Sequence, residues 1–435
     1  MFEAFQNIAK IPELKKRVLF SLSMLAVYRI GCHVPTPGID TAALAHFFKQ
    51  AQGTLLGMFD MFSGGALQKL TVFALGIMPY ISSSIIFQLL QVVVPSIEKL
   101  SKEGESGRKK IIQYTRYGTI VLSVVQALGI SIGLESMRGP AGEMVVPSPG
   151  WGFRIMTVIT LTAGTAFIMW LGEQMSEKGL GNGISLIIFA GIVARIPSAI
   201  ANSYRLMSTG QLSLFTLIFI FVLMYAVIWA IVYVERGQRR VPIHYAKRVV
   251  GLKTFGAQSS HLPLKVNMAG VIPPIFASSI IMFPATVGNF INIPWVQRAS
   301  KSLTPGNWVY NVFYVAFIVF FCYFYTAVTF NPADVADNIK KHGGYIPGIR
   351  PGTETSEHLD RVLTKLTFAG AIYISAVCVL PSILIGKFNL PFYFGGTALL
   401  IAVGVGMDTV SQIESHLITR NYDGFMKGVK IRGRK

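Results

Sequence analysis

The sequence predicts an all-α membrane protein that crosses the bilayer ten times and is built from two related halves. Hydrophobic residues make up 52% of the 435 residues and charged residues only 14%, which does not fit a soluble protein. Ten stretches are long and apolar enough to span a bilayer. A proline-interrupted apolar motif occurs twice, about 195 residues apart, which indicates an internal repeat.

Each predicted span holds about 20 mostly apolar residues, the length needed to cross the hydrocarbon core of a bilayer. The predicted spans are roughly 18–34, 74–95, 115–134, 151–172, 184–203, 212–235, 267–287, 309–330, 363–386 and 392–418. An even number of spans places both termini on the same side of the membrane.

The basic residues predict which side that is. A net charge of +19 could suggest nucleic-acid binding, but the Lys and Arg residues lie in the polar stretches between spans and favour alternate stretches. The side of the N-terminus carries 29 of the 39 basic residues, nine lie on the opposite side, and Arg29 falls within the first span. Because basic loops stay in the cytoplasm, both termini are predicted to be cytoplasmic.

The repeated motif predicts the path of the substrate. Residues 60–95 join a Gly-Gly turn, a short half-polar segment and an apolar helix with Pro79 near its start. Ser278–Ile281 repeats Ser83–Ile86, with Pro274 in the place of Pro79. Broken backbone is tolerated at membrane depth only where it is buried in protein or lines a cavity. We therefore expect the two motifs to face each other across a cavity.

The stretch 66–76, which follows the Gly-Gly turn, is too polar to span the membrane and too apolar to lie in water. A short helix folded back into the mouth of the cavity would account for this composition. An interfacial helix lying on the outer surface would account for it equally well.

Two cytoplasmic loops are unusually long. Residues 236–266 contain seven basic residues and no acid, with β-branched and aromatic residues on both arms of a predicted hairpin. Residues 331–362 begin with a predicted helix from Pro332 to Lys341 and continue into a tip rich in Gly and Pro that carries Arg350. A positive face opposite lipid head groups is one interpretation. Partner binding is favoured, because attraction to a membrane surface does not need the interleaved Pro, Gly and Tyr.

The sequence offers no pattern of a catalytic, metal or cofactor site. No zinc-ligand spacing, phosphate-binding loop, nucleophile elbow or dinucleotide fingerprint is present, and the three cysteines are scattered. Gly179–Gly183 is better interpreted as a tight turn and helix start. A secondary transporter of a small solute is the alternative that the repeat and the broken helices support. A transporter would need ionisable groups at mid-membrane, and an intramembrane enzyme would need a nucleophile or a set of metal ligands. The sequence has Ile, Ser, Gly and Pro at these positions.

Six ordered blocks resemble the SecY family, the channel subunit of the bacterial Sec protein translocase. They are MFSGGAL (61–67), ALGIMPYISSSII (74–86), GLGNGISL (179–186), NMAGVIPPIFASSI (267–280), NPADVADNIKKHGGYIPGIRPG (331–352) and FGGTALLIAVGVGMD (394–408). The resemblance implies two five-helix halves, 1–207 and 208–435, around a central hourglass pore. It further implies a protein-conducting channel that passes unfolded secretory polypeptides and releases transmembrane segments sideways through a lateral gate.

The resemblance also assigns candidate residues. The pore ring would consist of Ile77, Ile81, Ile184, Ile188, Ile275 and Ile401. A short plug helix within residues 62–73 would include Phe62, Ser63, Gly64, Gly65, Leu67 and Lys69. The lateral gate would run between the second and third spans and the seventh and eighth, with Ser82, Ser83, Ser84, Gln88, Ser278 and Ser279 as candidates. Ordinary packing of small residues between helices is the alternative for these serines.

The resemblance implies partners for the basic loops as well. In the family, these loops dock the SecA motor ATPase and the ribosome, whose RNA presents phosphates that Arg and Lys bind electrostatically. The predicted docking residues are Arg236, Arg239, Arg240, Lys247, Arg248 and Arg350. The other implied partners are the small membrane subunits SecE and SecG, nascent polypeptides and the lipid bilayer. The implied location is the bacterial cytoplasmic (inner) membrane.

Overall fold

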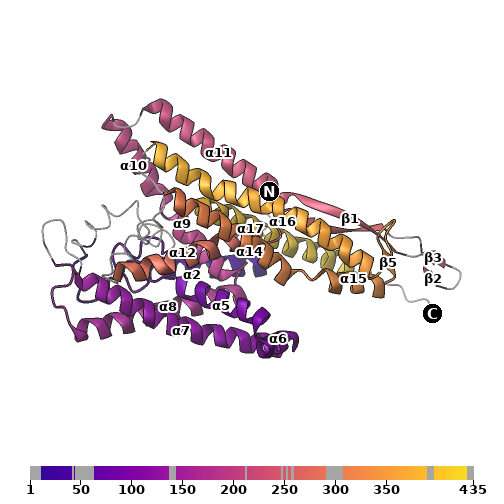
Figure 1. The fold of residues 1–435 in the computed structure, drawn as a ribbon, viewed down its shortest axis with the longest axis horizontal. Helices are drawn as coiled ribbons and strands as arrows, with labels where there is room; N and C mark the ends of the chain where they lie inside the picture. The colour runs from indigo at the N-terminus through magenta and orange to yellow at the C-terminus, as the bar shows by residue number, and fades with distance from the viewer. Residues whose placement is uncertain are drawn as a thin grey trace.

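The computed structural model describes residues 11–41, 44, 63–136, 144–210, 213–245, 248–250, 253–255, 259–290, 307–388 and 396–428. Within this part, the chain forms an elongated bundle of helices, and a small β-sheet extends from one end of it (Figure 1). The membrane part is therefore all-α, and the β structure is confined to a loop region.

Proline and asparagine fix several helix starts in the first part of the chain. The helices there are α2 (Pro12–Gly31), α5 (Met78–Val93), α6 (Pro95–Lys102), α7 (Glu105–Ser136), α8 (Trp151–Lys178), α9 (Gly183–Val193) and α10 (Ile196–Ser208). Pro79 and Pro95 lie in the first turn of their helices, where a missing N–H group leaves no hydrogen bond unmade. Val94 before Pro95 is extended, and α5 and α6 therefore meet at 98°. The side chain of Asn182 accepts hydrogen bonds from the N–H groups of Ile184 and Ser185, so the predicted tight turn and helix start are confirmed.

The second part of the chain contains longer helices. They are α11 (Leu214–Arg236), α12 (Ile272–Phe290), α14 (Trp308–Thr329), α15 (Pro332–Lys341), α16 (Thr353–Phe388) and α17 (Gly396–Gly428). The predicted helix from Pro332 to Lys341 is confirmed, and Asn331 caps it by accepting the N–H of Ala333 at 3.1 Å. α7 and α16 begin earlier than their predicted spans because their first turns are polar and extend into water.

Each of the ten predicted spans coincides with a helix or a helix pair. Seven stretches of the described chain are long and apolar enough to cross a membrane, and α5 with α6 gives an eighth. The first and seventh predicted spans fall on α2 and α12. Only 11% of the most apolar window of α11 is buried, so large apolar side chains such as Phe215 and Trp229 face outward. An outward apolar surface on this scale requires lipid or another membrane helix around it, and the chain is a multi-pass membrane protein.

The predicted hairpin is confirmed and has an additional strand. β1 (Gln238–Tyr245) and β4 (Ser259–Lys265) pair antiparallel, from Gln238 opposite Lys265 to His244 opposite Ser259. β2 (Arg248–Val250) and β3 (Lys253–Phe255) form a separate antiparallel pair. β5 (Gly344–Tyr345), from the other long loop, joins the free edge of β1. The two long loops are therefore parts of one sheet at the end of the bundle where α15 lies (Figure 1).

The helices pack as two groups. In the first group, α7 contacts both α5 and α8, and α2 contacts α8 and α9. In the second group, α12, α14, α16 and α17 pack in sequence order, and α11 contacts α17. Contacts between the groups include α9 against α17 and α12 against both α5 and α7. These contacts join the groups within the described residues, and the main hydrophobic core contains residues of both groups.

Candidate functional site

The six predicted ring isoleucines come together in the main hydrophobic core. Four are buried, with exposed fractions of 3% for Ile77, 9% for Ile81, 5% for Ile188 and 2% for Ile401. The partly buried Ile184 and Ile275 pack against this core. Branched aliphatic side chains make no hydrogen bonds, so a narrow ring of them excludes water and ions without selecting a sequence.

The segment 63–77, which contains the predicted plug, is a run of turns and not a helix. The prediction of a short helix is wrong for this described part, while Phe62 lies outside the described residues. Gly64, Gly65 and Gly76 have φ values of 67°, 89° and 56°, which interrupt any helix. Ser63, Gly64 and Leu67 are buried, Gly65 is half-buried and Lys69 is exposed.

Glycines on two neighbouring helices make room for this segment. A side chain at Gly31 of α2 would overlap the ring of Phe73, and one at Gly164 of α8 would overlap the backbone of Val72. The ring of Phe73 stacks on Tyr28 of α2 and on Phe167 of α8, with centroid distances of 6.0 and 5.9 Å. The segment is therefore packed tightly into the first helix group.

The predicted gate residues of α5 form close contacts with α7. Ser83 is 1% exposed, and its hydroxyl donates a 2.8 Å hydrogen bond to the carbonyl of Thr115. A side chain at Gly118 would collide with the Ser83 hydroxyl, so the two helices touch here. Gln88 donates to the Ser84 hydroxyl at 3.3 Å, and Ser82 is half-buried.

The predicted gate residues of α12 turn back onto their own helix. The hydroxyls of Ser278 and Ser279 both donate to the carbonyl of Ile275, at 2.9 and 2.8 Å. Because these hydroxyls donate within α12, neither of them donates a hydrogen bond to α5 or α7. Separating α12 from α5 and α7 would therefore break no hydrogen bond donated by Ser278 or Ser279.

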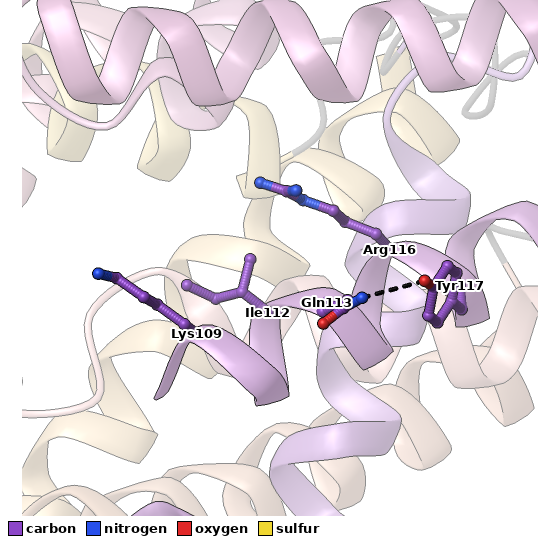
Figure 2. A pocket seen from close by; sticks show the side chains of 5 residues that line it. All are labelled: Lys109, Ile112, Gln113, Arg116 and Tyr117. Atoms are coloured by element: carbon purple, nitrogen blue, oxygen red, sulfur yellow. Dashed lines mark hydrogen bonds between the residues drawn. The ribbon is translucent and has the colours of Figure 1, made fainter. Parts of the chain in front are cut away.

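A basic hollow of about 460 Å³ lies beside the N-terminal part of α7. Figure 2 shows its lining residues Lys109, Ile112, Gln113, Arg116 and Tyr117, which all come from this helix. This hollow was not predicted from the sequence.

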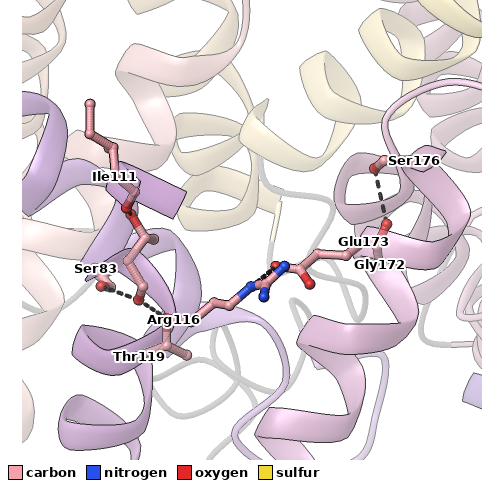
Figure 3. Close-up of polar contacts among 8 residues, drawn as sticks. Ser83, Ile111, Arg116, Thr119, Gly172, Glu173 and Ser176 are labelled. Carbon is pink, nitrogen blue, oxygen red and sulfur yellow. Dashed lines mark hydrogen bonds and ion pairs between the residues drawn. The ribbon is translucent and has the colours of Figure 1, made fainter. Parts of the chain in front are cut away.

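Arg116 also joins α7 to α8. Its Nε donates to Glu173 Oε1 at 2.8 Å, an ion pair between helices that Figure 3 places beside the Ser83 contact. On the opposite end of the same helix pair, Arg154 and Glu135 form a second ion pair at 2.6 Å. Salt links at both ends therefore hold α7 to α8, and the sequence predicted neither pair.

The predicted docking residues that the structure describes are exposed or lie on strands. Arg236, Arg239, Arg240 and Arg350 are exposed, and Arg248 lies on β2. Lys247 lies outside the described residues. Val241 and Leu264 of the hairpin share a hydrophobic cluster with Ile346 and Leu359 of the second loop. Arg239 and Arg240 lie on β1 of the sheet formed by β1, β4 and β5, which is called the docking sheet below, whereas Arg236 ends α11 and Arg350 follows β5.

Glu235 and Asn267 join the base of the docking sheet to α12. Asn267 is 4% exposed, and its side-chain nitrogen donates to Glu235 Oε1 at 2.6 Å and to the Gly270 carbonyl at 3.1 Å. Val266 N–H donates to the Gly237 carbonyl at 3.0 Å, which closes the hairpin base. The pairing of Glu235 with Asn267, 32 residues further along the chain, could not be predicted from spacing.

Replacing Glu235 with Ala is expected to destabilise the protein by about 1–3 kcal/mol, because one buried N–H donor of Asn267 loses its acceptor. The expected readouts are a lower melting temperature in detergent and faster amide hydrogen exchange in residues 264–271. Glu98→Ala is the matched control, since Glu98 pairs with Lys102 on the exposed surface of α6 and should change stability far less. Equal effects of the two substitutions would contradict this role of Glu235.

Within the described residues, no group of three or more His, Cys, Asp or Glu side chains is arranged to hold a metal ion. Cys32, Cys322 and Cys378 are free and buried. The candidate features of the described chain are a hydrophobic core that includes the six isoleucines, a packed turn segment, a seam between helix groups and a sheet with exposed arginines.

Known proteins share both the sequence and the fold. The SecY family profile matches residues 71–410. The protein translocase subunit SecY of Pseudomonas aeruginosa is 52% identical over 97% of this chain and 95% of the relative. The SecY subunits of Escherichia coli K12 and Aquifex aeolicus are 51% and 46% identical, covering 97% and 98% of this chain and 96% and 100% of the relatives.

The fold is similar to that of solved channels. A structure described as a protein conducting channel has a TM-score of 0.68 at 18% identity, and 93% of each chain is covered. Sec61 in a canine ribosome-channel complex has a TM-score of 0.65 at 17% identity, also with 93% of each chain covered. With about half of its residues identical to the SecY relatives along nearly their whole length, the chain belongs to the SecY family.

Proposed function

We propose that this chain is the protein-conducting channel of a bacterial Sec translocase and that Ile77, Ile81, Ile184, Ile188, Ile275 and Ile401 form its constriction. The observation that carries this proposal is their convergence from α5, α9, α12 and α17 into one hydrophobic core. A ring from both helix groups can widen when the groups move apart, and it offers no hydrogen bonds that would favour one sequence. That suits unfolded polypeptides of any sequence.

The seam between α12 and the pair α5 and α7 is the proposed lateral gate. It lies where the two helix groups, residues 1–207 and 208–435, contact each other beside the constriction. The proposed gate residues are Ser82, Ser83, Ser84 and Gln88 of α5 and Ser278 and Ser279 of α12. An opening at this seam would let a transmembrane segment pass sideways into lipid, whereas the segment 63–73 would plug the outer side of the pore.

The docking sheet is the proposed binding surface for the motor ATPase SecA and for the ribosome. Its exposed arginines can bind carboxylates of a protein or phosphates of ribosomal RNA. SecE and SecG are the proposed small membrane partners, and the exposed apolar faces of helices such as α11 are available to membrane helices and lipid. The proposed location is the bacterial inner membrane with both termini in the cytoplasm.

The test is a crosslink from a secretory chain arrested in transit. A photo-reactive residue at position 77 or 275 should crosslink to the arrested chain, and one at Tyr225, which is 73% exposed on α11, should not. Crosslinking must depend on the motor ATPase and ATP. Contact at 225 but at neither 77 nor 275 would exclude a polypeptide path through the core and would leave the solute transporter as the remaining hypothesis.

A further inference from the structure

Arg29 lies inside the first predicted span, and the proposed constriction does not use it. Charged side chains within membrane spans are costly and commonly functional, so their partners matter. Arg29 lies in the last turn of α2 and is half-buried. Within the described residues, its guanidinium forms no ion pair with a carboxylate but donates from Nη1 to the carbonyl of Gly64 at 3.2 Å.

The preceding residue makes a parallel contact. Tyr28 is 1% exposed, and its hydroxyl donates to the carbonyl of Ser63 at 3.2 Å. Consecutive residues of α2 therefore hold consecutive carbonyls of the segment 63–73. The ring of Tyr28 also stacks on Phe73 at the other end of this segment, with a centroid distance of 6.0 Å.

The backbone of the segment is shaped for this contact. Gly64 adopts φ 67°, a conformation that favours glycine, and an added Cβ would lie 2.9 Å from Gly191 Cα of α9 and 3.1 Å from Arg29 Nη1. A side chain at position 64 would collide with the backbone of α9 and with Arg29. Glycine therefore lets the carbonyl of residue 64 come close to α2. The turn thus fits between two helices of the same group.

We propose that Tyr28 and Arg29 form a latch, called the α2 latch, that holds the base of the segment 63–73 in its closed position. Two hydrogen bonds to backbone carbonyls suit a reversible latch. Water in an opened pore can replace each carbonyl, so the net stabilisation is modest and the segment can leave. Because the contacts use main-chain oxygens, side-chain identity at Ser63 matters little to the latch, whereas the donors on α2 are essential to it. The inference rests on the proposed role of the segment 63–73 as a plug.

The test measures how often the segment leaves its site. Ala66 is fully buried, so a cysteine introduced there should react with a water-soluble thiol reagent only when the segment has moved. Tyr28→Phe removes one hydroxyl and keeps the ring stack, and Arg29→Met removes the donors at similar length. Each change is expected to speed labelling about two- to tenfold, the range for one net hydrogen bond. Arg29→Lys keeps a donor and a charge and should stay near the unmodified rate.

Tyr225→Phe is the matched control, because it removes a hydroxyl from an exposed tyrosine of α11 and should leave labelling unchanged. Resting conductance in planar bilayers is measured on the same variants, together with thermal unfolding to check that they fold. If Arg29→Met does not fold, Tyr28→Phe alone decides. Unchanged labelling with Tyr28→Phe in the folded channel overturns the latch. Faster labelling without any rise in conductance supports the latch but contradicts the role of the segment as a plug.

Discussion

Replacing Ile81 and Ile275 together with Gly is expected to raise the resting ionic conductance of the purified protein in planar bilayers. Ile81 comes from the first helix group and Ile275 from the second, and both pack in the same core. Removing both side chains from the proposed constriction should let water enter, and ions follow water. We expect a rise of about tenfold or more, since each 1.4 kcal/mol removed from a barrier speeds passage about tenfold.

The control must separate leakage from helix damage, because glycine inside a helix itself costs about 1 kcal/mol. Ile159→Gly with Ile218→Gly provides it, since these isoleucines are 63% and 52% exposed on α8 and α11. This control protein should be destabilised without leaking. If the conductance of the Ile81→Gly, Ile275→Gly protein stays at the resting level, or rises equally in the control protein, Ile81 and Ile275 do not form the constriction.

Helices that depend on local sequence could be predicted, and contacts between distant segments could not. The α15 bounds follow from an asparagine cap, a proline in the first turn and a change to Gly and Pro after its end, all within residues 331–347. The hairpin of β1 and β4 likewise follows from one continuous stretch. β5 was missed because two residues carry no strand signal, and only the fold brings Gly344 to Tyr245.

The site shows the same division. The repeated proline motif predicted where the chain breaks, and the isoleucines that the family resemblance assigned lie in one core. Beyond the predicted Gly-Gly turn, the turns of 66–77 were missed since the Ala and Leu there favour a helix, whereas the structure places Gly76 at positive φ and packs Val72 and Phe73 against α8 and α2. Arg29 was visible as a charge in a span, but its acceptor at Gly64 lies 35 residues away. Packing against distant segments, and not the local preference of the sequence for a helix, determines these contacts.

Changing Arg350 to Glu is expected to abolish ATP-driven transport of a secretory precursor into inverted membrane vesicles while leaving the protein folded. The Arg350 side chain is exposed, yet its backbone is fixed, because its carbonyl accepts the Thr355 hydroxyl at 2.8 Å and nearby Ile346 is 4% exposed in the loop cluster. A cation held on a rigid tip loses little entropy on binding an acidic group. Reversing its charge replaces attraction with repulsion and should weaken motor binding by about 2 kcal/mol or more, which is about thirtyfold in affinity.

Lys341→Glu is the matched control, because Lys341 is also exposed, lies at the end of α15 in the same loop and undergoes the same change of charge. If the loop acts only through its total charge, both variants should lose transport equally, and raising the salt concentration should weaken motor binding to both in parallel. If Arg350 makes one specific contact, Lys341→Glu should transport nearly normally. Normal transport by Arg350→Glu would contradict its assignment to motor docking. Lost transport with normal motor affinity would move its role from binding to a later step, the coupling of the bound motor to the channel.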